Sequence, residues 1–293
     1  ALARAQAADL MGQLLDGQCS DLETGAFCIA MRIKGETPPE MAGFLDAIDQ
    51  RLHKVPVTDA ALPVVVLPCY NGARKLPALA ALLALLLARQ GWPVLVHGAD
   101  TQTRQASTRD VLAQLGIAAA SASAPLRPGQ VRFVATEALH PGLARLLQAR
   151  WLIGLRNPAH SLVKLMNPAA TARALVVGSY THPAYAETMR AAFALRQQPA
   201  MLLRGTEGEP VADARRAPAM QILLPLQEAD CLTEPGQTGT LAALPDLPRA
   251  IDAASTAQYI RAVLDGQTPA PAPIARQAAL IARACQCLQD SSA

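Results

Sequence analysis

Apolar and polar positions along the first 60 residues follow the pattern of helices, with no strand-like apolar run before residue 62. Residues 1–16 are rich in Ala and Leu, residues 21–33 open with an Asp-x-x-Thr start, and a Pro-Pro-Glu sequence stands at residues 38–40. Proline fits the first turn of a helix, and an acidic side chain there interacts favourably with the helix dipole. The pattern therefore predicts a small helical domain over residues 1–60.

From residue 62 the pattern changes to short apolar runs that are separated by stretches of helical character. The first run, LPVVVL at residues 62–67, is Val-rich like a buried strand, and a polar loop at 68–75 and an apolar helix at 76–90 follow it. Alternating strands and helices favour a mainly parallel sheet with helices on both faces. We therefore expect an α/β domain over residues 61–293. Its further strand candidates are residues 93–97, 131–135, 174–177, 200–203 and 220–224.

Composition narrows the partners that the chain can recognise. Hydrophobic residues make up 51% of the chain and aromatic residues only 3%, so the core must consist mainly of Ala, Leu and Val. The same figures leave few rings for stacking on nucleobases, with Tyr70, Tyr180 and Tyr185 near predicted loops. A net charge of +3 with 26 Lys and Arg permits a polyanionic partner without implying one, so the placement of the charges must decide.

Cysteine and histidine spacing gives no sign of a disulfide framework or a metal site. The six cysteines are irregularly spaced without a C-x-x-C pair, which indicates reduced thiols, and His140 and His160 have no second ligand at helical spacing. No signal peptide is expected, because the N-terminus lacks a basic segment followed by an apolar one. The longest apolar run, residues 76–88, is too short to span a bilayer. We expect a cytoplasmic protein with no membrane partner.

Four short motifs resemble, in the same order, those of one known family. They are MRIKGET at residues 31–37, HP at 140–141, RNPAHSLVKLMNP at 156–168 and GTEG at 205–208. Each is similar to a segment of anthranilate phosphoribosyltransferase, whose fold is shared with the pyrimidine nucleoside phosphorylases. The resemblance implies an α/β protein with a small helical N-terminal domain, completed by about residues 156–168, and a larger α/β domain with a mainly parallel central sheet.

The motifs that hold the phosphoribosyl donor in that family are altered here. Its glycine-rich G-T-G-G-D-G loop lets backbone N–H groups approach a pyrophosphate, whereas residues 68–75 are PCYNGARK with a single glycine. Its K-H-G-N-R motif corresponds to VHGAD at residues 96–100, so the lysine and the asparagine are absent. We expect a former phosphoribosyl cleft that is lined by Asn71, Gly72, His97 and Gly98.

The magnesium-binding pair of the family is replaced as well. The aspartate and glutamate that end its G-x-D-G-x-D-E motif correspond to Pro210 and Val211, and neither side chain can bind a hard cation. Glu207 and Glu209 lie close by but out of register with the motif. Arg156 stays in register with the arginine that holds the anthranilate carboxylate in that family. The simpler alternative for Arg156 is an ion pair that supports the hinge between the domains.

Basic residues lie in the segments that correspond to the rim of this cleft and to the hinge. The altered loop ends in Arg74 and Lys75 at the predicted start of a helix, where cations oppose the helix dipole unless an anion binds there. A solvated loop end is the plain alternative. NGARK at residues 71–75, with RIKGE at 32–36 and RNPAHSL at 156–162, resembles the YbiB-type branch of the superfamily. Members of that branch keep the fold, form dimers and bind nucleic acid with little sequence preference. The resemblance implies eight candidate nucleic-acid contacts: Arg32, Lys34, Arg74, Lys75, Arg104, Arg156, Lys164 and Arg204.

Three hypotheses follow from the sequence. The first is a homodimer, formed through the helical domain, that binds single-stranded or duplex nucleic acid and has no cofactor, metal or catalytic residue. The second is a divergent phosphoribosyltransferase, a glycosyltransferase in which Glu207 and Glu209 hold magnesium and Arg156 positions an acidic acceptor. The third is a structural or protein-binding dimer, which a scattered distribution of the arginines would favour.

Overall fold

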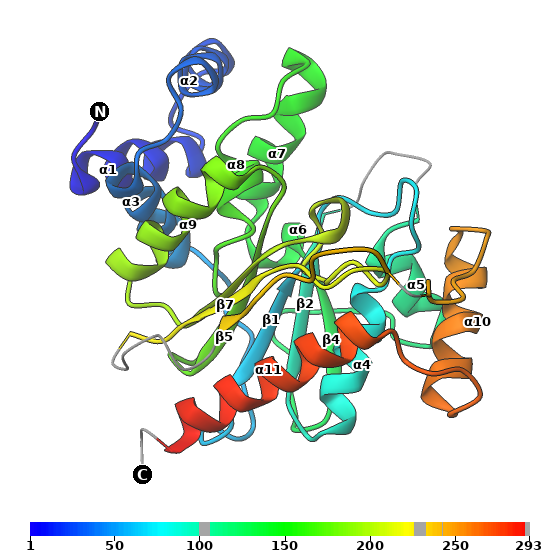
Figure 1. Ribbon diagram of the computed structural model, residues 1–293. Coiled ribbons are helices and arrows are strands. Elements are labelled where there is room, and N and C mark those ends of the chain that lie inside the picture. The colour runs from blue at the N-terminus through cyan, green and yellow to red at the C-terminus, as the bar shows by residue number, and fades with distance from the viewer. Residues whose placement is uncertain (100–105, 226–232, 242, 291–293) are drawn as a thin grey trace.

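In the computed structural model, a group of helices stands beside one eight-stranded sheet (Figure 1). The structure describes residues 1–99, 106–225, 233–241 and 243–290. No described helix combines the length and apolar character needed to cross a membrane. The helices are α1 (Arg4–Leu15), α2 (Asp21–Lys34), α3 (Pro38–Asp49), α4 (Ala80–Arg89), α5 (Thr108–Gln114), α6 (Thr136–Leu139), α7 (Pro141–Ile153), α8 (Ala159–Leu162), α9 (Pro183–Leu195), α10 (Ala253–Leu264) and α11 (Ala272–Asp290), with a 3₁₀ turn η1 (Thr206–Gly208).

The sheet has the strand order β3-β4-β2-β1-β5-β6-β7-β8. Neighbouring strands from β3 to β6 run parallel, and β7 pairs antiparallel with both β6 and β8. This arrangement confirms the predicted fold class of a helical N-terminal domain plus an α/β domain with a mainly parallel sheet. The strands are β1 (Val64–Pro68), β2 (Val94–Gly98), β3 (Ala119–Ala120), β4 (Val131–Ala135), β5 (Ala174–Tyr180), β6 (Ala200–Arg204), β7 (Met220–Leu223) and β8 (Thr233–Glu234).

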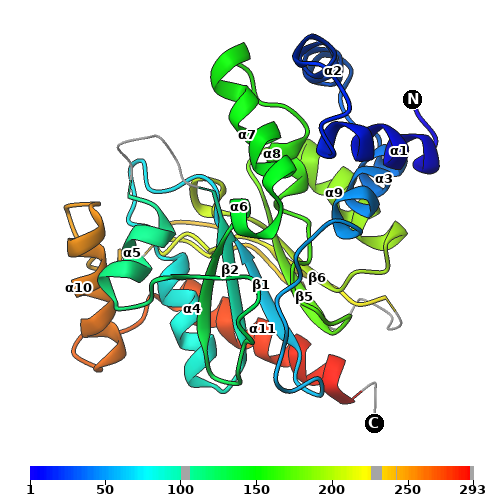
Figure 2. The same ribbon diagram turned by 180° about the vertical axis from the view of Figure 1, so that it is seen from behind.

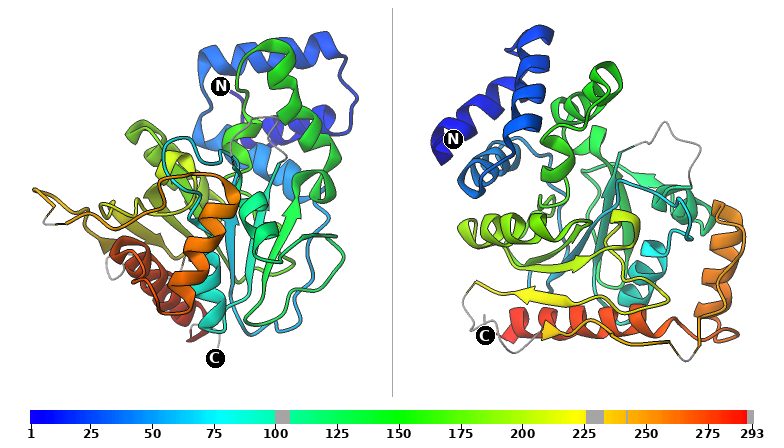
Figure 3. Two further views of the ribbon diagram at one scale, coloured as in Figure 1. Left: turned by 90° about the vertical axis from the view of Figure 1, so that its right-hand side faces the viewer. Right: turned by 45° about the horizontal axis from the view of Figure 1, so that its top comes forward.

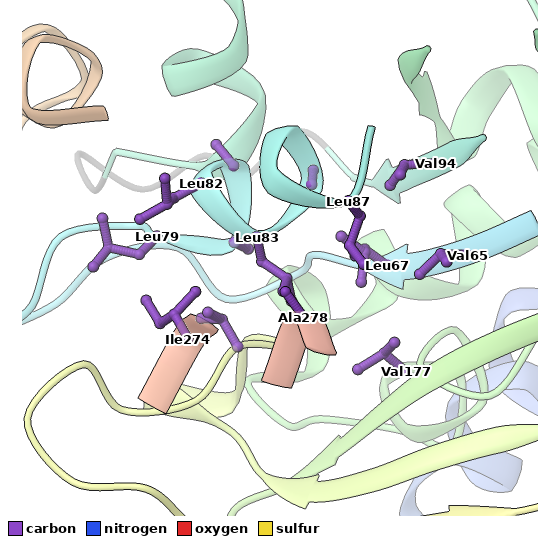
Figure 4. Close-up of a cluster of buried hydrophobic side chains, with 14 of the residues drawn as sticks. Val65, Leu67, Leu79, Leu82, Leu83, Leu87, Val94, Val177, Ile274 and Ala278 are labelled. Atoms are coloured by element: carbon purple, nitrogen blue, oxygen red, sulfur yellow. The ribbon is translucent and has the colours of Figure 1, made fainter. Parts of the chain in front are cut away.

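The sheet carries a separate apolar core on each face, because successive strand residues point to opposite sides. Val65 and Leu67 of β1 pack with α4, α10 and α11 on one face. Val64 and Val66 pack with α1, α3 and α7 on the other. Figure 4 shows the first core, in which α4 and α11 lie together against β1. Burial on both faces explains why β1 is apolar at every position.

Helix α4 begins at Ala80, later than the sequence predicted. The backbone N–H groups of Arg74 and Lys75 bond instead to the carboxylate of Glu207. Pro77 has no N–H group to contribute to a helical turn. Arg74 and Lys75 therefore lie in a loop, and the expectation that they stand at a helix N-terminus was wrong.

The helical layer stands at the end of the molecule where the parallel strands finish (Figures 2 and 3). Helix α1 packs on α3, α7 packs on α1, and α8 packs on α3, so segments far apart in sequence share one core. Helix α9 joins this layer to the sheet through its contacts with α3, β5 and β6. The predicted division at residues 60 and 61 stays a prediction.

Glu40 ties together three parts of the helical domain. Its fully buried carboxylate accepts hydrogen bonds from the backbone N–H of Leu2 at 2.7 Å, from both N–H and Oγ1 of Thr37 at 3.0 and 2.9 Å, and from Nζ of Lys34 at 2.6 Å. Burial alone would raise the pKa of Glu40, but the hydrogen bonds outweigh it and lower the pKa to about 2. The start of α1, the end of α2 and the start of α3 are held by this one side chain.

We expect the contribution of Glu40 to stability to disappear in acid. Its folded pKa of about 2 lies below the ordinary 4.5, so the contribution is complete above about pH 4.5 and is lost as the pH falls toward 2. A shift of this size corresponds to about 3 kcal/mol of unfolding free energy at neutral pH. Urea unfolding of the wild type and of Glu40→Gln should differ by about 2–3 kcal/mol at pH 7 and by about half of that near pH 3.

The control for this measurement is Glu187→Gln, because Glu187 is an exposed acid on α9 that pairs with Arg190. It should unfold like the wild type at both pH values. A difference between the wild type and Glu40→Gln that is unchanged at pH 3 would contradict the linkage.

Candidate functional site

A cleft of about 410 Å³ lies between the helical layer and the carboxyl ends of the parallel strands. Its walls come from the end of α2, from α8 and its flanking residues, from the end of β5 and from the start of α9. Arg32 and Glu36 reach it from the helical side, and Tyr180 and Tyr185 from the sheet side. Open α/β proteins bind ligands outside the carboxyl ends of their strands, so position and volume both fit a binding site.

Arg156 lines this cleft together with Arg32. Its guanidinium donates to Oδ1 of Asn71 at 3.5 Å and so connects the hinge segment to the loop after β1. Burial lowers the pKa of Arg156, and the charges of Arg150, Arg74 and Arg32 lower it further. Among the described residues no carboxylate pairs with Arg156, and the hinge ion pair stays an alternative without support there. Cations that repel one another in this way are stabilised by a bound anion.

Lys164 follows α8 and lines the cleft in a largely buried position. Its Nζ donates to the carbonyl oxygen of Gly208 at 2.8 Å. Burial lowers the pKa of Lys164 to about 8, with the negative charge of Glu209 opposing this shift and the charge of Arg156 adding to it. The Lys164 amine therefore loses its proton near pH 8.

The turn after β6 inserts two carboxylates into the loop after β1. Oε1 of Glu209 accepts hydrogen bonds from the backbone N–H groups of Asn71 at 2.6 Å and Gly72 at 3.3 Å. The two oxygens of Glu207 accept from the N–H groups of Arg74 at 2.7 Å and Lys75 at 2.9 Å. Four backbone N–H groups of the loop after β1 thus donate to carboxylates of this chain. This loop corresponds in sequence to the family's pyrophosphate loop.

Gly208 allows the two glutamates to point the same way. It adopts φ +88°, and a Cβ there would overlap the side-chain amide of Asn71. Its carbonyl oxygen accepts from Oγ of Ser179 and from Nζ of Lys164, both at 2.8 Å. Glu207 itself has φ +54°, a left-handed conformation that is unfavourable for a side chain with a Cβ. The turn is therefore held by specific contacts rather than by the intrinsic preference of its residues.

This geometry does not fit the hypothesis that Glu207 and Glu209 hold magnesium. Their oxygens accept hydrogen bonds from N–H groups, and Oε2 of Glu209 also accepts from Oγ1 of Thr108 at 3.1 Å. A cation at these oxygens would meet the positive ends of the same N–H dipoles. Among the described residues, no three His, Cys, Asp or Glu side chains gather as a metal site.

None of the four residues expected to line the cleft, Asn71, Gly72, His97 and Gly98, is among the residues that line it, contrary to expectation. His97 and Gly98 serve the fold instead. His97 is fully buried, its Nδ1 bonds to Oη of Tyr70 at 2.8 Å, and burial lowers its pKa to about 3, so the ring stays neutral. Tyr70 in turn bonds to Oγ1 of Thr136 at 2.8 Å. Gly98 lies against the carbonyl oxygen of Cys69, where a Cβ would clash. Tyr70 is therefore unavailable for stacking on a base.

The remaining predicted contacts fall into three groups. Arg32, Arg74, Lys75 and Arg204 are exposed, with Arg204 at the end of β6 opposite Tyr180. Lys34 is engaged in its ion pair with Glu40. Arg104 lies outside the described residues.

Sequence reasoning missed Arg150 as a member of the cluster. Arg150 lies in the last turn of α7 and packs over the ring of Trp151, with 4.8 Å between the guanidinium carbon and the ring centroid. In the sequence, the sign of this membership was that Arg150 is a basic residue shortly before Arg156. Helix α7 ends at Gly154 in a left-handed conformation, and the positive charge of Arg150 lowers the pKa of Arg156.

We expect Lys164 to react as a neutral amine near pH 8. The chain contains four lysines, so labelling with acetic anhydride can be followed at each site by peptide mass spectrometry. The labelling rate at Lys164 should reach half its maximum near pH 8. Arg156→Ala should move this midpoint upward, because the charge of Arg156 lowers the pKa of Lys164. Exposed Lys75 reports the reactivity of the reagent, and a rate at Lys164 that still rises steeply above about pH 9.5 would contradict the expectation.

Sequence comparison links the whole chain to proteins of this fold. A sequence model for the helical bundle domain of a glycosyl transferase family matches residues 1–51. The uncharacterized protein YbiB of Escherichia coli (strain K12) is 38% identical over 275 residues, which cover 92% of this chain and 84% of that protein. An anthranilate phosphoribosyltransferase from a Nocardioides species is 28% identical over 271 residues, covering 90% of this chain and 78% of the enzyme.

Solved structures agree with the sequence relatives on the fold. Anthranilate phosphoribosyltransferase from Thermus thermophilus superposes with a TM-score of 0.75 at 21% identity and covers 99% of this chain and 86% of its own. The Saccharomyces cerevisiae enzyme in complex with PRPP and Mg gives a TM-score of 0.72 at 14% identity, with 99% and 85% covered. Together with the shared helical domain and the extended identity to YbiB, these matches show that the chain belongs to the anthranilate phosphoribosyltransferase-like family.

Proposed function

We propose that the protein is a homodimer that binds nucleic acid with little sequence preference through the cationic rim of the interdomain cleft. The observation that carries the proposal is a group of cations at one place: Arg156 and Arg32 line the cleft, and Arg156 bonds to Asn71 in the loop that also carries the exposed Arg74 and Lys75. The charges of neighbouring arginines lower the pKa of Arg156. Such a group binds anions more strongly than isolated surface charges do, because each added phosphate is attracted by several cations at once.

The available cations are placed so that a phosphate backbone can meet several of them. Arg32 comes from the helical layer, Arg74 and Lys75 from the loop after β1, and Arg204 from the end of β6. None of these four forms an ion pair with a carboxylate in the part of the chain that the structure describes. Glu36 adds one acid to the cleft, and burial raises its pKa. The rim therefore has unpaired positive charge for phosphate contacts.

The same site offers little for reading base sequence. Tyr180 and Tyr185 line the cleft and can stack on an unpaired base, which is tolerant of base identity. The described cations reach the cleft from helix ends and loops rather than from a helix exposed along its length for insertion into a major groove. Binding that depends on phosphates and stacking should be sensitive to salt and indifferent to sequence.

A dimer through the helical domain is supported by an apolar stripe on α2. Leu22, Ala26, Ile29 and Ile33 follow one another at helical spacing and are exposed, and Leu22 and Ile33 are 84% and 82% exposed. On α7, Leu152 is 89% exposed. Both helices project from the same end of the molecule (Figure 1). Exposed apolar groups of this kind mark protein interfaces, and a dimer would double the cationic surface and add avidity.

A divergent phosphoribosyltransferase is the second candidate. The extended identity to enzymes of that name and the placement of Arg156 at the cleft favour it. The two glutamates bonded to the loop after β1 weigh against it, because they face the N–H groups that would hold a pyrophosphate. Loss of anthranilate fluorescence on incubation with phosphoribosyl pyrophosphate and magnesium would support the enzyme.

We expect a mixed-sequence fluorescent single strand to bind with steep salt dependence in an anisotropy titration. Arg74→Ala/Lys75→Ala should lower the slope of log K against log salt by about 1.4, since each lost contact to a single strand removes about 0.7. The matched control is Arg276→Ala/Arg283→Ala, which removes the same charge from the exposed side of α11. No binding at low salt would contradict the nucleic-acid proposal and leave the phosphoribosyltransferase and the structural dimer as candidates. An equal loss in the control would contradict the placement of the contacts at Arg74 and Lys75.

We expect Ile33→Asp combined with Leu152→Asp to convert a dimer to a monomer, because each change buries a charge in an apolar interface. Sedimentation equilibrium should give twice the mass of the 30.8 kDa chain for the wild type and the single mass for the variant. Leu244→Asp introduces the same charge at a leucine that is 66% exposed elsewhere and should leave the mass unchanged. A monomeric wild type would exclude the dimer.

A further inference from the structure

We propose that Glu207 and Glu209 occupy, from within the chain, an anion site formed by the backbone N–H groups of the loop after β1, and that they thereby exclude phosphate and pyrophosphate from this loop. The proposal goes beyond nucleic-acid binding and does not rest on it. It assigns a function to two acids of the turn after β6 that neither hold a metal in the observed geometry nor pair with an arginine or lysine side chain in the described structure.

The contacts of the two carboxylates are those that a bound anion would make. Successive N–H groups of one loop, at Asn71 and Gly72 and then at Arg74 and Lys75, converge on them at 2.6 to 3.3 Å. Converging backbone N–H groups form a concave site that is selective for anions. The side chains of Arg74 and Lys75 are exposed beside it, and Arg156 contacts Asn71 from the cleft. A phosphate in this place would have both N–H donors and cations around it.

The two glutamates differ in how firmly they are held. Glu209 is buried, and both of its carboxylate oxygens accept hydrogen bonds, one from the loop after β1 and the other from Thr108. Glu207 is partly exposed, its contacts are the two N–H groups at the loop end, and its backbone is left-handed. We infer that Glu209 is a permanent part of the loop, whereas Glu207 is the group whose removal opens the anion site.

Gly208, which lies between Glu207 and Glu209, holds the turn in its position. Gly208 carries no side chain, and its carbonyl oxygen is fixed by Ser179 and Lys164. The turn therefore stays in place when only the carboxylate of Glu207 is removed. In Glu207→Ala, the N–H groups of Arg74 and Lys75 lose their acceptor while the surrounding cations remain.

The test is calorimetric titration of inorganic pyrophosphate into the wild type, Glu207→Ala and Glu207→Gln. We expect Glu207→Ala to bind pyrophosphate at least about tenfold more tightly than the wild type, because a charged competitor for the same donors is removed. Glu207→Gln keeps an acceptor oxygen without the charge and should lie between the two. Because Glu207→Gln preserves the size of the side chain, it decides the question if Glu207→Ala does not fold.

The matched control is Glu187→Ala, which removes one exposed negative charge from α9 without touching the loop. It should bind pyrophosphate like the wild type. An equal gain in Glu187→Ala would assign the effect to net charge, and no gain in folded Glu207 variants would show that the loop is not an anion site; either result overturns the proposal. Because the ligand is pyrophosphate and no nucleic acid is present, failure here is separate from failure of the nucleic-acid proposal.

Discussion

The hydrogen bonds between the buried carboxylate of Glu209 and the loop after β1 are the constraint on which the candidate site depends. A buried carboxylate is costly unless its oxygens are satisfied, and here two backbone N–H groups and Thr108 satisfy them. These contacts fix the loop to the turn after β6 and thereby set where Arg74, Lys75 and Arg156 stand. They also account for the late start of α4, since the N–H groups before it are directed to Glu207.

The placement of charge matters more in this chain than its amount. A net charge of +3 is small for 293 residues, but the arginines at the cleft come from α2, from the loop after β1 and from the segments around α7 and α8. Some acids away from the cleft make local contacts: Glu40 pairs with Lys34 in the helical domain, and Asp110 forms part of the capping box of α5. The cations are mostly arginines, and a planar guanidinium binds phosphate oxygens in pairs better than an ammonium does. A locally positive rim can therefore arise in a nearly neutral protein.

The helical layer has an inner and an outer surface with different chemistry. Its inner surface is apolar and merges with the core on one face of the sheet, with Glu40 as the buried polar connection among α1, α2 and α3. Helix α2 buries only Cys28 and Met31 within the described chain, and its exposed surface carries an apolar stripe among charged residues. The end of α2 also delivers Arg32 to the cleft. Exposed apolar side chains and a cation that lines the cleft are thus neighbours on one helix.

The sequence by itself determined the fold class and the family. Val-rich runs such as residues 64–67 require burial on both faces, and their alternation with helices leaves few architectures other than a parallel sheet. The resemblance to one family also proposed Arg156, Arg74 and Lys75 as nucleic-acid contacts, and these stay predictions. It was wrong about His97, since a histidine beside a glycine after a strand has the same local pattern whether it faces a ligand or the core. Only the tertiary structure could bring Glu207 and Glu209 to a loop more than 130 residues earlier in the chain. Those contacts depend on the order of β1, β5 and β6 within the sheet, which is not encoded in the spacing of the residues that meet there.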